Sequence, residues 1–142
     1  MPYGPYDPQG TVLSQFRQEQ IAVIVLLASD EECLRKAGRP LRTLYEHEGW
    51  QVIYLPIPDF GVPAKADLER GVQSTIEQAR AGKNIAVHCS AGIGRTGLFT
   101  ASLAKHVLGV SGEDAIAWIR HSIPGAVETW AQRQLVLGHD PA

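Results

Sequence analysis

A cysteine and an arginine stand six positions apart in a short glycine-rich stretch of this 142-residue chain. The stretch reads Cys89, Ser90, Ala91, Gly92, Ile93, Gly94 and Arg95. Glycines let the backbone curl so that successive N–H groups point inward and form an anion-binding nest. The planar guanidinium of Arg95 can bind two oxygens of one phosphate group, which lysine cannot do in the same geometry. Residues 90–95 therefore predict a phosphate-binding loop, with the sulfur of Cys89 at its floor.

Ionisation of the Cys89 thiol would make it a nucleophile toward phosphorus. The N-terminus of the helix expected after the loop supplies only about 0.3–2 kcal/mol toward a nearby negative charge. This is too little to ionise a thiol at neutral pH, so the loop amides, Arg95 and the hydroxyl of Thr96 must contribute the rest. We expect Cys89 to be a thiolate at neutral pH and to attack phosphorus.

Segments of strand length alternate with segments of helical pattern along the chain. The continuous apolar run 21–27 predicts a strand covered on both faces, and strands are also predicted at 50–55 and 85–88. Helices are predicted at 8–17, 67–81, 96–108, 111–121 and 128–137, with helical structure also after the capping pattern of Ser29 and Glu32. This order predicts one α/β domain over residues 1–142, with a mostly parallel sheet of about four to five strands and helices on both faces. The phosphate loop would then follow the carboxyl end of a strand, where open parallel sheets bind ligands.

Two other interpretations of the loop are possible. The spacing of Gly92, Gly94 and Gly97 also matches the dinucleotide-binding fingerprint. No strand is predicted just before Glu113 and Asp114, the acids about 20 residues later, and only 45 residues follow Gly97. A buried structural cysteine beside a tight turn is the second alternative. Neither accounts for a cysteine and an arginine in the same loop.

Three segments resemble the protein tyrosine phosphatase superfamily. Cys89, five residues and then Arg95 form its signature, and residues 88–97 are similar to the tyrosine-specific form of that signature. Residues 58–63 resemble the mobile acid loop of the family, and their Asp59 lies 30 residues before Cys89. Residues 124–132 are similar to the water-positioning segment of small atypical dual-specificity phosphatases. The resemblance covers roughly residues 20–138.

The resemblance implies a metal-independent phosphatase that needs no cofactor and forms a phosphocysteine on Cys89. Asp59 would protonate the leaving group and then activate a water, which Gln132 would orient. His88 would hold Cys89 in place through the loop backbone, and Thr96 would hydrogen-bond the sulfur. The structural alternatives are a turn-stabilising aspartate for Asp59 and an ordinary exposed helix residue for Gln132.

The predicted substrate is a phosphorylated protein or peptide. Apolar walls from Ile93, Phe60 and Val62 would suit phosphotyrosine, with phosphoserine or phosphothreonine in second place. Phosphoinositide phosphatases of the superfamily place lysines where this chain has Ala91 and Ile93, so lipid substrates are less favoured. The alternative from another functional class is a non-catalytic phosphotyrosine-binding module on the same scaffold.

Composition narrows the partners and the compartment. A net charge of −2, a pI near 6.2 and the absence of a Lys or Arg run argue against nucleic acid or an anionic membrane as partner. No apolar run approaches the ~18 residues that span a bilayer, and the first residues lack the pattern of a secretory signal. Two cysteines and five histidines show no metal-ligand spacing. We therefore expect a cytoplasmic monomer.

Several single residues keep open assignments. Cys33 is expected to be a buried free thiol, with a reversible disulfide to Cys89 as the alternative. Glu128 would either brace Arg95 or simply begin the last helix. The three tryptophans, Trp50, Trp118 and Trp130, are predicted to lie in the core or partly in it.

Overall fold

A computed structural model describes residues 1–91 and 93–138, and three parallel strands form one open sheet in that part of the chain. The strands are β1 (Ile21–Leu26), β2 (Gln51–Tyr54) and β3 (Asn84–His88), in the order β2-β1-β3. The α/β class and the parallel sheet are confirmed, but the predicted count of four to five strands was too high. Residues 1–20 form tight turns and a helix instead of further strands, because Pro2, Pro5 and Pro8 cannot donate backbone hydrogen bonds to a sheet.

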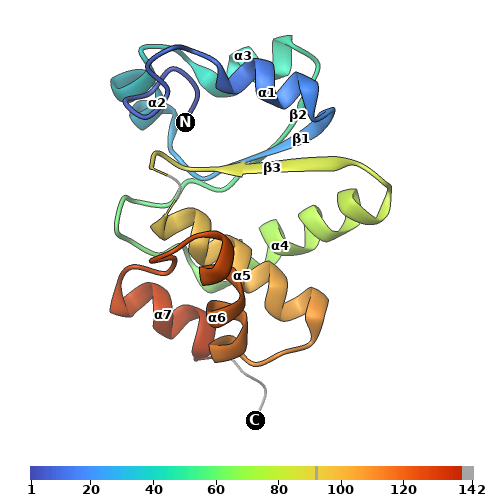
Figure 1. The fold of residues 1–142 in the computed structure, drawn as a ribbon, viewed down its shortest axis with the longest axis vertical. Helices are drawn as coiled ribbons and strands as arrows, with labels where there is room; N and C mark the ends of the chain where they lie inside the picture. Colours follow the sequence, from blue (N-terminus) through green and yellow to red (C-terminus); the bar gives the residue numbers. More distant parts are fainter. Residues whose placement is uncertain (92, 139–142) are drawn as a thin grey trace.

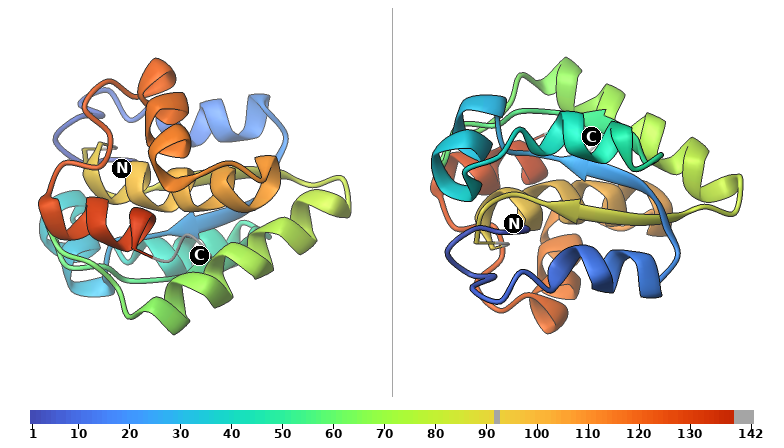
Figure 2. Two further views of the ribbon diagram at one scale, coloured as in Figure 1. Left: turned by 90° about the horizontal axis from the view of Figure 1, so that it is seen from below. Right: turned by 90° about the horizontal axis from the view of Figure 1, so that it is seen from above.

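Helices cover both faces of the sheet, as predicted (Figure 1). They are α1 (Val12–Gln18), α2 (Asp30–Ala37), α3 (Leu41–His47), α4 (Lys65–Arg80), α5 (Gly94–Leu108), α6 (Gly112–Ser122) and α7 (Trp130–Leu137). Helices α1 to α3 lie on one side of the sheet and α4 to α7 on the other, and the views from below and above show the two layers separately (Figure 2). No helix within the described residues is both long and apolar enough to cross a membrane.

The central position of β1 in the sheet explains why its sequence is continuously apolar. Val25 packs in the cluster shared with α4 to α7, whereas Ile24 and Leu26 pack in the cluster shared with α1 to α3. All three side chains are fully buried. A strand covered by helices on both faces needs apolar residues at successive positions, because successive side chains point to opposite faces.

The prediction for the tryptophans was wrong for two of the three. Trp118 on α6 is 53% exposed, and Trp130, the first residue of α7, is 75% exposed. The buried face of α6 is supplied by Ile116 and Ile119, and Trp118 lies outside that stripe. Trp50 is half-buried, and its indole N–H donates to the carbonyl of Ile21.

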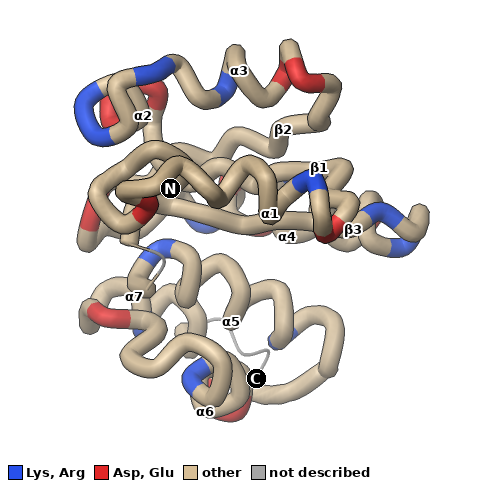
Figure 3. The backbone as a smooth tube through the Cα atoms, turned by 45° about the horizontal axis from the view of Figure 1, so that its top comes forward, with Lys and Arg blue, Asp and Glu red and all other residues tan. Residues whose placement is uncertain are grey.

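All three strands end at the same edge of the sheet. Leu26 lies opposite Tyr54 on one side and opposite His88 on the other. The described segments that follow the strands, residues 27–29, 55–64 and 89–91, therefore meet at this edge. Helix α2, which begins there, carries acidic residues in its first turn and basic residues in its last turn (Figure 3). This arrangement complements the helix dipole.

Candidate active site

The predicted phosphate loop connects β3 to α5 at the carboxyl edge of the sheet. Cys89 follows the strand directly and is buried, with 3% of its surface exposed. The hydroxyl of Thr96, in the first turn of α5, donates to Cys89 Sγ over 3.1 Å. Ser90 is also buried, whereas Ala91 and Ile93 are exposed. Gly92, which the sequence places in the same loop, lies outside the described residues.

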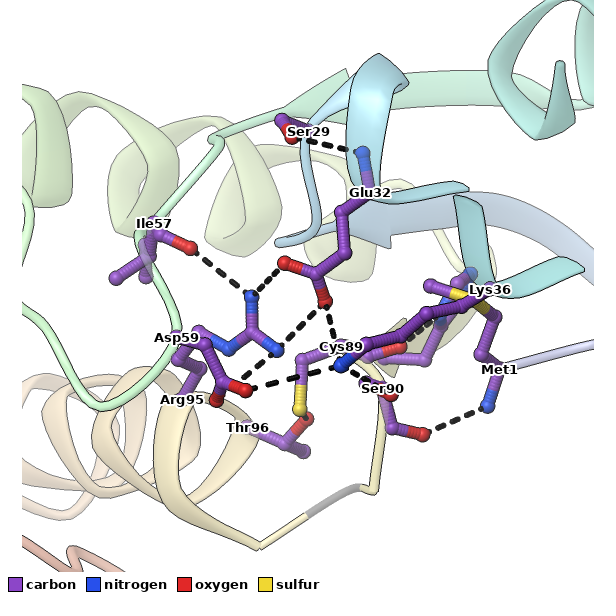
Figure 4. Close-up of polar contacts among 11 residues, drawn as sticks. Met1, Ser29, Glu32, Lys36, Ile57, Asp59, Cys89, Ser90, Arg95 and Thr96 are labelled. Carbon is purple, nitrogen blue, oxygen red and sulfur yellow. Dashed lines mark hydrogen bonds and ion pairs between the residues drawn. The ribbon is translucent and has the colours of Figure 1, made fainter. Parts of the chain in front are cut away.

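Arg95 is almost completely buried and its guanidinium is held by α2 and the acid loop (Figure 4). Nη1 donates to Glu32 Oε1 over 2.8 Å and to the carbonyl of Ile57 over 3.0 Å, and Nη2 donates to Glu32 Oε2 over 2.8 Å. Burial opposes the charge of Arg95, but the hydrogen bonds to Glu32 and the electrostatic interactions with Cys89, Glu32 and Asp59 outweigh it and raise the pKa of the guanidinium. Burial likewise opposes the charge of Glu32, yet Arg95 and Lys36 lower its pKa. The pair is therefore ionised on both sides.

Glu32 is the brace of Arg95 that the sequence did not identify. The sequence offered Glu128 for this role, but the carboxylates that contact the guanidinium in the described residues come from Glu32 and Asp59. The carboxylate of Glu128 lies beside Gly94 instead, where an added Cβ would meet its Oε1. The capping pattern did place Glu32 correctly, since its backbone N–H donates to Ser29 Oγ. Its side chain then remains available for Arg95.

The segment 55–64, which contains the acid loop of residues 58–63, brings Asp59 to the same edge. Its carboxylate lies 3.4 Å from Arg95 Nη2 through Oδ1 and 3.7 Å from Lys36 Nζ through Oδ2. The loop turns tightly here, because the N–H of Gly61 donates to the carbonyl of Pro58 and Phe60 adopts a left-handed φ of 59°. A non-glycine residue in this conformation costs free energy and is held by its surroundings. The structure thus brings Cys89, Arg95 and Asp59 to one edge of the sheet, and their catalytic roles stay predictions.

Gln132 is fully buried, so the alternative of an ordinary exposed helix residue is wrong. Its Oε1 accepts from the N–H groups of Glu128 and Thr129, and its Nε2 donates to the carbonyl of Gly61 over 3.1 Å. Together with the Thr129 side chain it forms a capping box at the start of α7. Gln132 therefore ties the acid loop to α7. Its predicted role in orienting a water stays a prediction.

The ring of His88 hydrogen-bonds to the backbone of the phosphate loop. Its Nδ1 lies 2.9 Å from the carbonyl oxygen of Cys89, and its Nε2 lies 2.8 Å from the hydroxyl of Tyr45. A carbonyl only accepts, so Nδ1 carries the proton and Nε2 accepts from Tyr45. With both ring nitrogens engaged, the ring is placed to position the loop.

Comparison with known proteins identifies the family. A family model described as "Polymorphic toxin system, DSP-PTPase phosphatase" matches residues 3–107. The chain belongs to this family. The dual specificity protein phosphatase CDC14C of Symphalangus syndactylus is 29% identical over 138 residues, which cover 95% of this chain and 26% of that protein. The tyrosine-protein phosphatase CDC14 of Candida albicans is 41% identical over 59 residues, 42% of this chain and 11% of that protein. The chain thus spans about a quarter or less of these relatives.

Solved structures agree with the family assignment. Tk-PTP in its active form is 30% identical to this DSP-PTPase phosphatase domain, with a TM-score of 0.75 over 83% of this chain and 77% of that one. Kinase associated phosphatase with its catalytic cysteine replaced by serine has a TM-score of 0.83 at 21% identity, over 96% of this chain and 80% of that one. At 21% identity, the similarity to kinase associated phosphatase shows a shared fold and nothing more.

The buried thiol of Cys33 differs from Cys89 in its surroundings. Both cysteines are free, but Cys33 packs in the cluster with α1 to α3 and Cys89 in the cluster on the other face of the sheet. Burial and the nearby charges of Asp30 and Glu32 raise the pKa of Cys33 to about 11, so it is a thiol at neutral pH. The expectation of a buried free thiol at Cys33 is therefore confirmed, and the alternative, a reversible disulfide with Cys89, stays untested. Among the described residues, no group of three or more His, Cys, Asp or Glu side chains could hold a metal ion.

Acid should destabilise this phosphatase domain through His88. Burial lowers the pKa of His88 to about 4, from an ordinary value of 6.5. Between these values the unfolded chain binds a proton that the folded protein does not, so the stabilisation is complete above about pH 6.5 and is lost as the pH falls toward 4. We expect about 2 kcal/mol less stability from this group at pH 5.0 than at pH 7.5, measured by urea unfolding. A His88→Asn variant should show a flatter pH dependence, and an exposed-residue control, His121→Asn, should not; equal slopes in both variants would contradict the assignment.

Proposed function

We propose that this domain hydrolyses phosphotyrosine in proteins or peptides, and phosphoserine or phosphothreonine more slowly, through a phosphocysteine on Cys89. The observation that carries the proposal is the convergence of three groups on one edge of the sheet. Thr96 donates to the sulfur of Cys89, Arg95 is fixed by Glu32, and the carboxylate of Asp59 lies 3.4 Å from that guanidinium. These are a nucleophile, a phosphate-binding group and a proton donor, the set that displacement at a phosphate monoester requires.

The reaction would proceed in two displacements. In the first, the Cys89 thiolate forms a bond to phosphorus as the bond to the leaving oxygen breaks, and that oxygen takes a proton from Asp59. In the second, water attacks phosphorus, Asp59 takes a proton from the water, and the bond to sulfur breaks. The hydroxyl of Thr96 already donates to Sγ, so it would stabilise the departing thiolate. Arg95 and the loop amides would neutralise the phosphoryl oxygens throughout.

The rim of the site favours an aromatic phosphomonoester. Phe60 and Val62 on the acid loop and Ile93 on the phosphate loop have exposed apolar side chains. Trp130 is exposed at the start of α7, two positions before the Gln132 that holds the acid loop. Apolar walls around a phosphate site would stabilise a phenyl ring more than a single methylene. The proposal also includes a cytoplasmic monomer whose reaction needs neither a metal nor a cofactor. Neither nucleic acid nor a membrane is a proposed partner.

Substrate specificity can be tested with peptides that differ only in the phosphorylated residue. We expect kcat/KM for the phosphotyrosine peptide to exceed the values for phosphoserine and phosphothreonine peptides by about 10-fold or more, because the apolar rim discriminates by side-chain area. A soluble phosphoinositide should react more slowly, and EDTA should leave every rate unchanged. Well-folded protein that binds the phosphotyrosine peptide without hydrolysing it would instead be a binding module. Preference for the phosphoinositide, or loss of activity in EDTA, would also overturn the proposal.

A further inference from the structure

Lys36, in the last turn of α2, contacts the phosphate loop, the acid loop and Glu32 (Figure 4). Its Nζ donates to Ser90 Oγ in the phosphate loop over 3.1 Å. The same nitrogen lies 3.7 Å from Asp59 Oδ2 in the acid loop and 3.6 Å from Glu32 Oε2, the brace of Arg95. An ammonium has three donors, so one side chain can serve all three partners.

The local structure explains why Lys36 points into the site. It follows Glu32 by one helical turn, so both side chains leave the same face of α2. That face borders the carboxyl edge of the sheet, because only three residues separate the end of β1 from the start of α2. The side chain of Lys36 is only 25% exposed. Its position is therefore set by the site and not by solvent.

Asp59 has two cationic neighbours in the site, Arg95 and Lys36. In this structure its carboxylate lies between Arg95 and Lys36, and its side chain is about half exposed. A phosphate in the loop would compete with Asp59 for Arg95 Nη2, because both are anions that seek the same guanidinium. The contact with Lys36, on the other carboxylate oxygen, does not involve that guanidinium.

We propose that Lys36 is a positioning residue that holds Asp59 in place to protonate the leaving group. The proposal rests on the proposed function of Cys89, Arg95 and Asp59. In the first displacement the sulfur–phosphorus bond forms, the phosphorus–oxygen bond breaks, and the proton of Asp59 moves to the leaving oxygen. A leaving group that is stable as an anion hardly needs this proton, whereas the tyrosine oxygen, with a pKa near 10, does. The dependence on leaving group therefore reports how well Asp59 is placed.

The experiment compares Lys36→Met with wild type on p-nitrophenyl phosphate and on a phosphotyrosine peptide. We expect kcat for the peptide to fall about 10-fold, since a small misplacement of a catalytic group is costly, while kcat for p-nitrophenyl phosphate changes less than about 3-fold. KM and inhibition by vanadate should hardly change, and Lys36→Arg should recover most of the lost rate. Lys83→Met removes an exposed lysine that precedes β3 at the far end of the strand, and it should match wild type on both substrates.

A double variant separates positioning from other roles. Asp59→Ala alone should lose about 10²–10⁴-fold with the peptide, and adding Lys36→Met to it should cause little further loss, because Lys36 acts through Asp59. Equal losses on both substrates with a raised KM and weaker vanadate inhibition would show that Lys36 binds the phosphate directly and would overturn the inference. Additive losses in the double variant would overturn it as well. Wild-type protein that turns over neither substrate would refute the proposed function instead.

Discussion

Replacement of Cys89 by serine should abolish hydrolysis, with phosphopeptide turnover reduced by about 10⁴-fold or more. Under the proposed function the nucleophile is the sulfur of Cys89, which accepts the 3.1 Å hydrogen bond from Thr96 and interacts electrostatically with the guanidinium of Arg95. A serine hydroxyl stays protonated in the same surroundings, so it needs a base to become a nucleophile. His88 cannot be that base, because its Nδ1 donates to the carbonyl of residue 89 and its Nε2 is occupied by Tyr45.

Binding and trapping distinguish loss of chemistry from loss of structure. Cys89→Ser should still bind the phosphotyrosine peptide in a titration, since Arg95 and Glu32 are unchanged. Acid quenching during turnover should give a phosphorylated wild-type protein by mass spectrometry and none from the variant. Cys33→Ala is the matched control, because that thiol lies in the other core cluster, and it should keep nearly full activity. A serine variant that turns over the peptide at a comparable rate would exclude the phosphocysteine.

The parts of the site that sequence reasoning found are those with a local signature. The spacing of Cys89 and Arg95 specifies a loop between a strand and a helix, and the parallel sheet then brings the acid loop to the same edge. The run 21–27 identified the central strand because both of its faces are buried. The phosphate loop and the central strand needed only neighbouring residues and a general rule about open sheets, whereas the acid loop with Asp59 was identified through the family resemblance.

The parts that were missed depend on contacts distant in sequence. Glu32 and Arg95 are 63 positions apart, and Lys36 and Ser90 are 54 apart. The capping pattern at Ser29 gave Glu32 a sufficient local role, so nothing in the sequence demanded a second one. The burial of Gln132 could not be predicted either. The capping box at the start of α7 is visible in the sequence, but the hydrogen bond from Gln132 to Gly61, 71 positions away, leaves no local pattern. Trp130 shows the converse error, since a large apolar residue was assumed to be inside.

Loss of the Glu32 carboxylate should give the largest change in stability. Arg95 is 2% exposed, so Glu32→Ala would leave a buried guanidinium without its bidentate partner. Breaking a buried ion pair from one side costs about 3–5 kcal/mol, which corresponds to a fall in Tm of roughly 10–17 °C for a domain of this size. Because the pKa of Glu32 is lowered, this contribution is complete above the ordinary pKa of glutamate and is lost as the pH falls through the lowered value. Thermal unfolding at neutral pH measures the loss.

The neighbouring acid provides the control for this prediction. Glu31 lies in the same first turn of α2 but is exposed, so Glu31→Ala should change stability by no more than about 0.5 kcal/mol. Inorganic phosphate should raise the Tm of Glu32→Ala more than that of wild type, because an anion in the loop then gives Arg95 the partner it has lost. If Glu31→Ala and Glu32→Ala had the same Tm, the hydrogen bond to the carbonyl of Ile57 would be sufficient to hold the Arg95 guanidinium without Glu32. In that case Glu32 would be dispensable for the orientation of Arg95.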